Sequence, residues 1–172
     1  RLPRIRFLLA DDPGAGKTIM TGLLLKELKY RGLVRRTLVV VPGHLKDQWL
    51  REMKDRFGET FTIVDRSVMN ATWGRNVWRD QAQIVTSMDF AKQDDVMVAL
   101  SDAHWDLIVV DEAHKMAAYS ADKKTLAYKL GEALSAMTDH YLLMTATPHK
   151  GDPENFCLFL ELLDRDIYGS VK

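Results

Sequence analysis

The stretch FLLADDPGAGKT, residues 7–18, joins a short apolar run to a loop of small residues that ends in Gly16, Lys17 and Thr18. An apolar run of this length is typical of a buried strand, and apolar residues recur at helical spacing after Thr18. Small residues between a strand and a helix let backbone N–H groups surround a phosphate, and the helix N-terminus adds partial positive charge. Asp11 stands where the strict phosphate-loop pattern has glycine. The strand–loop–helix order nevertheless predicts a phosphate-binding loop made of Asp12, Pro13, Gly14, Ala15, Gly16, Lys17 and Thr18.

Six short apolar runs are spread along the chain, at residues 7–10, 38–41, 61–64, 84–86, 107–110 and 141–144. They are continuous rather than alternating, which is expected of strands covered on both faces in a parallel sheet. Helical patterns separate most of them, at residues 19–28, 45–57 and 126–137, and a last helix is expected to begin near Asp152. This order of strands and helices predicts an α/β fold with right-handed crossovers.

The spacing of apolar side chains predicts which residues these helices bury. In the first helix the expected buried stripe is Ile19, Met20, Leu23, Leu24 and Leu28. In the second, the four-residue spacing of Trp49 with its apolar neighbours predicts a core residue, and Trp73 and Trp78 are expected to anchor the irregular segment 66–81.

The composition is that of an ordinary globular domain. The chain has 172 residues, of which 47% are hydrophobic and 28% charged, and this excludes a disordered tail, a collagen-like fibre and a disulfide-stapled miniprotein. Lys+Arg and Asp+Glu both number 24, so local patches rather than a global positive field would have to attract a nucleic acid. No apolar run approaches the length of a membrane helix, and we expect a cytoplasmic protein without a membrane partner. Since the chain begins at Arg1 without a methionine, we expect residues 1–172 to be one domain excised from a longer protein.

Two further polar motifs follow apolar runs. Asp111 and Glu112 come directly after the run 107–110, where parallel sheets place ligand-binding groups. Asp111 is predicted to hold Mg²⁺ and Glu112 to deprotonate an attacking water, although an acidic pair also suits a helix N-terminus. Thr145 and Thr147 follow the run 141–144, and in isolation they suit a turn as well as a hydroxyl relay.

Taken together, the order Gly-Lys-Thr, Asp-Glu-Ala-His and Thr-Ala-Thr-Pro resembles motifs I, II and III of superfamily 2 helicases. The stretches LLADDPGAGKT, VVVPGHLKDQWLREM, IVTSMDF, WDLIVVDEAHKM and LLMTATPHKGDPENF resemble the Swi/Snf-like branch, and within it bacterial translocases of the RapA and DISARM types. The resemblance implies the N-terminal lobe of a two-lobed, ATP-driven motor on duplex DNA. Its fold would be a RecA-like three-layer sandwich with helices on both faces of a mainly parallel sheet.

The resemblance also assigns roles to single residues. It implies ATP and Mg²⁺ as ligands of Lys17, Thr18 and Asp111, with Thr18 and Asp111 on the metal, and catalysis by Glu112 together with Lys17 and Asp111. His114 matches the position that couples the nucleotide site to motif III, here Thr145 and Thr147. Two segments match DNA-contacting motifs Ia and Ib, and they comprise Pro42, Gly43, His44, Thr86 and Ser87. Contact with a DNA backbone needs N–H groups and short hydroxyls, which these segments offer.

The sequence departs from the family pattern in what it lacks. Motifs IV to VI are absent, and with them the second RecA-like lobe that supplies an arginine finger, so we expect these residues alone to hydrolyse ATP poorly. One alternative is a phosphate-loop kinase or GTPase, which the Asp-Glu-Ala-His and Thr-Ala-Thr-Pro motifs disfavour. The other is a nucleotide-gated DNA- or protein-binding module without efficient catalysis, which the presence of Lys17, Asp111 and Glu112 disfavours.

Overall fold

The computed structural model describes residues 6–10, 16–116 and 125–145. Within these ranges six strands form one sheet, in the order β1-β6-β5-β2-β4-β3, and every neighbouring pair is parallel. The strands are β1 Arg6–Ala10, β2 Thr37–Val41, β3 Thr62–Ile63, β4 Gln83–Ser87, β5 Trp105–Val110 and β6 Thr138–Thr145. Each contains or overlaps one of the six apolar runs, so the predicted parallel α/β sheet is confirmed.

The register brings the carboxyl ends of the central strands to one edge of the sheet. Val40 of β2 is level with Val110 of β5, and Val110 is level with Leu143 of β6. Ala10, the last residue of β1, is level with Thr145. The carboxyl ends of β1, β2, β5 and β6 therefore all lie at this edge, where parallel sheets bind their ligands.

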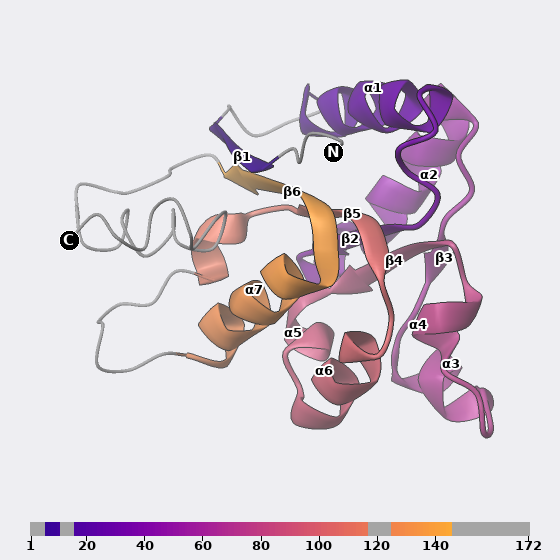
Figure 1. Cartoon of the computed structure of the whole chain (residues 1–172), viewed down its shortest axis with the longest axis vertical. Coiled ribbons are helices and arrows are strands. Elements are labelled where there is room, and N and C mark those ends of the chain that lie inside the picture. The colour runs from indigo at the N-terminus through magenta and orange to yellow at the C-terminus, as the bar shows by residue number, and fades with distance from the viewer. Residues whose placement is uncertain (1–5, 11–15, 117–124, 146–172) are drawn as a thin grey trace.

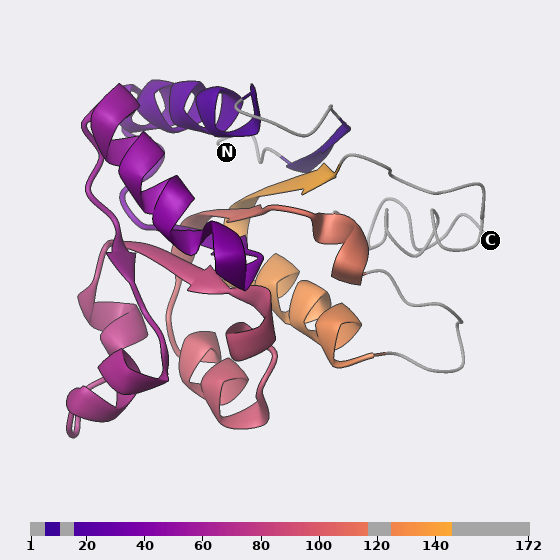
Figure 2. The same ribbon diagram turned by 180° about the vertical axis from the view of Figure 1, so that it is seen from behind.

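Helices cover both faces of the sheet (Figure 1, Figure 2). One face carries α1 Gly16–Tyr30 and α2 Lys46–Phe57, and the other carries α3 Arg66–Ala71, α4 Val77–Asp80, α5 Met88–Ala91, α6 Asp94–Ser101 and α7 Leu126–Met137. Alternate strand residues supply the two cores: Val39 and Val109 pack with α1 and α2, whereas Val40 and Val110 pack on the opposite side. The result is a three-layer sandwich.

The first helix buries only part of the stripe that the apolar spacing predicted: Leu28 is buried, and Ile19 and Leu24 are half-buried. Met20 is 47% exposed and Leu23 is 57% exposed, so their predicted burial is wrong. The buried side of α1 carries Thr21, Gly22 and Leu25 instead. A Cβ on Gly22 would lie 2.0 Å from the ring of Phe57 on α2. The two helices thus approach through small residues, which a search for apolar side chains does not count.

Segment 66–81 is anchored by one of its two tryptophans. Trp78 is fully buried against the core, as predicted, whereas Trp73 is 90% exposed, so the prediction that it anchors the segment is wrong. The helix predicted near Asp152 lies outside the described residues. None of the helices in the described ranges is both long enough and apolar enough to cross a membrane.

Candidate active site

A buried ion pair joins the first and second predicted motifs. Lys17 Nζ lies 3.1 Å from Asp111 Oδ1, and both side chains are less than one-tenth exposed. The same oxygen accepts the backbone N–H of Glu112 at 2.8 Å, while Asp111 Oδ2 accepts the indole N–H of Trp49 at 3.1 Å. Each carboxylate oxygen of Asp111 therefore has at least one donor, which is what a buried charge requires.

The backbone after β5 places these groups. Asp111 donates its N–H to the carbonyl of Val40 at 2.8 Å, so the pairing of β2 and β5 continues to the carboxylate itself. Glu112 then adopts a φ of 51°, and it is the one non-glycine residue with a positive φ in the described part of the chain. A left-handed conformation costs about 1–2 kcal/mol for such a residue. Strain of this kind is concentrated at functional sites, where the surrounding structure holds it in place.

Glu112 forms an ion pair with the basic residue one helical turn further on. Its Oε2 lies 3.1 Å from Lys115 Nζ, on η2 Ala113–Met116. Partial burial raises the pKa of Glu112, but the hydrogen bond and charge of Lys115, followed by the charges of His114 and Lys17, lower it by more. The net pKa therefore lies below that of an ordinary glutamate, and the side chain is a carboxylate at neutral pH. In this form it can accept a proton.

The coupling residues predicted from motif III are in part described. His114 Nδ1 lies 2.8 Å from Thr145 Oγ1, at the end of β6, so η2 and β6 are joined by a side-chain hydrogen bond. Thr145 is fully buried. Thr147 lies outside the described residues. His114 is therefore in direct contact with Thr145, one of the two residues predicted from motif III.

The residues at this edge have the donor types that magnesium and a nucleotide require. Thr18 is 4% exposed, in the first turn of α1 beside Lys17, and offers a hydroxyl; Asp111 offers a carboxylate. Magnesium binds oxygen ligands of this kind, and a helix N-terminus with a lysine suits phosphate. The described part of the predicted phosphate loop is Gly16, Lys17 and Thr18, whereas Asp12, Pro13, Gly14 and Ala15 lie outside the described residues.

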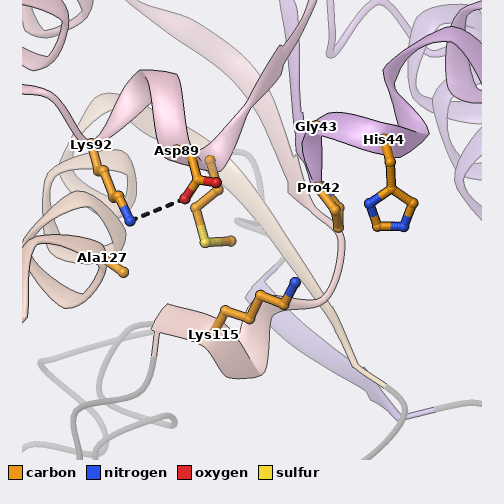
Figure 3. A pocket seen from close by; sticks show the side chains of 8 residues that line it. Pro42, Gly43, His44, Asp89, Lys92, Lys115 and Ala127 are labelled. Carbon is orange, nitrogen blue, oxygen red and sulfur yellow. Dashed lines mark ion pairs between the residues drawn. The ribbon is translucent and has the colours of Figure 1, made fainter.

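A second feature, a cavity of about 230 Å³, opens beside the segment predicted to contact DNA (Figure 3). Pro42, Gly43 and His44 line one side, with His44 exposed on η1 Gly43–Leu45. The remaining lining residues come from α5 and the segment after it, from η2 and from α7, and they are Met88, Asp89, Lys92, Lys115 and Ala127.

Two of these lining residues are basic and were missed by the sequence analysis. Lys92 forms an ion pair with Asp89 at 3.0 Å, and Lys115 is the partner of Glu112 described above. Their shared position could not be found from the sequence without the strand order, because one follows β4 and the other follows β5. Lys115 therefore touches both the cavity and the carboxylate of Glu112.

Thr86 and Ser87, the two residues predicted from motif Ib to contact DNA, both have buried side chains. Thr86 is fully buried, and its hydroxyl donates to the carbonyl of Val64 at 2.9 Å. We therefore leave the Thr86 side chain out of the proposed nucleic-acid surface. Ser87 is 8% exposed, and its Oγ accepts the N–H of Phe90, so it caps α5 beside the cavity.

Comparisons with known proteins show the family of this chain. Residues 4–172 match the family model described as "SNF2-related domain". The chain is 40% identical over 166 residues to the RNA polymerase-associated protein RapA of Photobacterium profundum, and 39% identical to that of Vibrio vulnificus. Each alignment covers 95% of this chain and 17% of the relative, so the chain spans about a sixth of these proteins.

A similar fold is found among solved structures. The SWI2/SNF2 ATPase core of Sulfolobus solfataricus in complex with dsDNA superposes with a TM-score of 0.76 at 22% identity, over 96% of this chain and 33% of that one. The helicase domain of Pyrococcus furiosus Hef superposes with a TM-score of 0.67 at 19% identity, over 93% of this chain and 33% of that one. The chain therefore belongs to the SNF2-related domain family, with RapA proteins among its relatives, and it has the RecA-like fold of a SWI2/SNF2 ATPase core.

Proposed function

We propose that this chain is the ATP-binding lobe of a DNA-dependent ATPase that couples ATP hydrolysis to movement along duplex DNA. One observation carries the proposal: the Lys17–Asp111 ion pair, with Glu112 beside it, at the carboxyl edge of the sheet. A lysine at a helix N-terminus and a carboxylate at the end of another strand of the same sheet are the groups that phosphate-loop ATPases use for phosphate and metal.

Each residue then has a role that its surroundings support. Lys17 would bind the outer phosphates, and Thr18 and Asp111 would hold Mg²⁺, which when bound would supply positive charge beside the transferring phosphoryl group. Glu112, a carboxylate at neutral pH, orients the attacking water and accepts its proton. His114, through Thr145, links this site to β6.

Duplex DNA is the partner that the second feature supports. The cavity beside η1 is lined by Lys92, Lys115 and His44 together with one acidic residue, Asp89. The two lysines pair with Asp89 and Glu112 in this structure, and their ammonium groups can donate to a phosphate backbone even though the chain has no net charge. The solved SWI2/SNF2 ATPase core that this fold resembles is in complex with dsDNA. Contacts to the backbone alone are independent of base sequence.

A second RecA-like lobe would complete the motor. The described chain covers a third of the solved ATPase core, and an arginine finger from a second lobe is worth orders of magnitude in turnover. We therefore expect residues 1–172 alone to bind Mg-ATP weakly and to hydrolyse it slowly.

Two substitutions in the full-length protein separate binding from chemistry. Glu112→Gln keeps the size of the side chain but removes the proton acceptor, so we expect Mg-ATP to bind and turnover to fall at least 100-fold, within the usual range for a general base. Asp111→Asn should instead raise the Mg²⁺ concentration that binding requires. Retention of full hydrolysis in both variants would contradict the assignment. Nucleotide-dependent DNA binding without hydrolysis in the unmodified protein would favour the nucleotide-gated module.

A further inference from the structure

We infer that Trp49 is a positioning residue for the metal site: its indole N–H holds one oxygen of Asp111, so that the carboxylate keeps the orientation in which it binds Mg²⁺. This inference rests on the proposed function, because it gives Asp111 the role of a metal ligand. The sequence analysis assigned Trp49 to the core alone, and its burial at 2% exposure confirms that part.

The donors around Asp111 are divided between its two oxygens. Oδ1 accepts from Lys17 and from the N–H of Glu112, whereas Trp49 is the donor to Oδ2 at 3.1 Å. When Lys17 turns to a phosphate, the indole and the Glu112 N–H are the two donors that stay on the carboxylate. An indole N–H donates and cannot coordinate a cation, so Trp49 orients the ligand without competing for the metal.

The other buried tryptophans show that burial does not by itself require such a bond. Trp78 and Trp105 are fully buried, and their indole nitrogens have no hydrogen-bond partner within the described residues. This core thus accommodates indoles by packing alone. Trp49 differs because its N–H donates to a buried carboxylate 62 positions away in sequence. This carboxylate directly follows β5, the neighbour of β2, and α2 comes after β2 in the chain.

The inferred role also connects the two features of the site. Trp49 lies on α2, which begins directly after the η1 segment that carries His44. The hydrogen bond therefore links α2, the helix that follows the cavity-lining η1, to the residue proposed to hold magnesium.

The test compares Trp49→Phe with Trp78→Phe in the full-length protein. Both variants lose a buried indole, but only the first loses a hydrogen bond seen in the structure. Thermal melting is followed at a fixed ADP concentration while Mg²⁺ is titrated, so the readout is the Mg²⁺ midpoint rather than activity. Loss of a hydrogen-bond partner behind a metal ligand lowers metal affinity by about 10- to 100-fold. We expect Trp49→Phe to raise the midpoint at least 10-fold and Trp78→Phe to leave it unchanged.

The possible outcomes are distinct. Equal midpoints in wild type and both variants would overturn the role of Trp49 while leaving the proposed function intact. A wild-type protein that does not respond to Mg²⁺ and ADP would overturn the proposed function, and the inference with it.

A second variant covers the case in which Trp49→Phe does not fold. Benzothienylalanine at position 49 has the shape of tryptophan with sulfur in place of the N–H. A raised midpoint in this variant supports the inference, and an unchanged midpoint refutes it.

Discussion

Replacing Lys17 with methionine should destabilise the nucleotide-free protein as well as abolish its response to ATP. Lys17 is 6% exposed and Asp111 is 3% exposed, so Lys17→Met leaves a buried carboxylate without its counter-charge. Breaking a buried pair in this way costs about 3–5 kcal/mol. Trp49 and the N–H of Glu112 remain as donors to Asp111, which places the expected loss near the lower end, at about 3 kcal/mol.

This loss is large enough to measure by thermal melting. For a domain of this size a loss of 1 kcal/mol lowers Tm by about 2–4 °C, so Lys17→Met should melt about 6–12 °C below wild type. Added Mg-ATP should raise the Tm of wild type, following RT ln(1 + [ATP]/Kd), and leave that of the variant unchanged. The double variant Lys17→Met with Asp111→Asn should lose less stability than the sum of the single losses, because the two side chains interact.

An exposed ion pair between α1 and the residue that directly follows it gives the control. Arg31 and Glu27 are paired at 2.6 Å but are both more than half exposed, so Arg31→Met should change the free energy of unfolding by less than about 1 kcal/mol. The expected Tm shift of Lys17→Met is at least about 6 °C. If this variant melted within about 2 °C of wild type and still responded to Mg-ATP, the stabilising role of the buried pair and the phosphate-binding role of Lys17 would both be refuted.

Two other residues give tests of the fold itself. Gly22→Ala places a methyl group where the Phe57 ring lies, so we expect the free energy of unfolding to fall by about 1–3 kcal/mol in chemical denaturation. Adding Phe57→Ala in the same chain makes room for the methyl group and should remove most of the loss that is due to Gly22→Ala. If the losses of the two single variants simply added in the double variant, the contact would be refuted. Burial raises the pKa of Glu59, but hydrogen bonds from Lys26 and Lys29 lower it by more, so the net pKa is below the ordinary value. The stabilisation by Glu59 is therefore present above the unfolded-state pKa of about 4.3 and lost as pH falls through the lower folded-state pKa. Glu59→Gln should accordingly have a lower Tm than wild type at pH 7, and the difference in Tm between the two proteins should be smaller near pH 3. An equal difference in Tm at both pH values would contradict the pairing of Glu59 with the two lysines.

Much of the sheet could be predicted from the sequence, because its strands are covered on both faces. Strands of this kind require continuous apolar runs, and the predicted strand at residues 107–110 lies within the observed β5, Trp105–Val110. The placement of Asp111 at a strand end followed from the same pattern. Helix faces were less predictable, since α1 packs through Thr21 and Gly22, which carry no apolar signal.

The contacts between motifs needed the strand order. Trp49 and Asp111 meet because β2 and β5 are neighbours, and no local pattern in the sequence states that pairing. The same holds for Lys92 and Lys115, which line one cavity from segments that follow two different strands, β4 and β5. Thr86 is a residue that the motif match predicted to lie at the DNA surface but that serves the core. Its hydroxyl donates to a backbone carbonyl inside the fold, and the match to a motif cannot distinguish this contact from a contact with DNA.

The central claim is that the carboxyl edge of this sheet joins an ATPase site to a duplex DNA surface, and a DNA-dependent ATPase measurement tests it most directly. Hydrolysis by the full-length protein is followed with duplex DNA, single-stranded DNA and RNA over a salt series, with Glu112→Gln as the inactive control. Contact with phosphates depends on counterion release, so we expect stimulation by duplexes of unrelated sequence to be similar and to fall steeply as salt rises. Stimulation by RNA alone, or by no nucleic acid at any salt concentration, would contradict the claim.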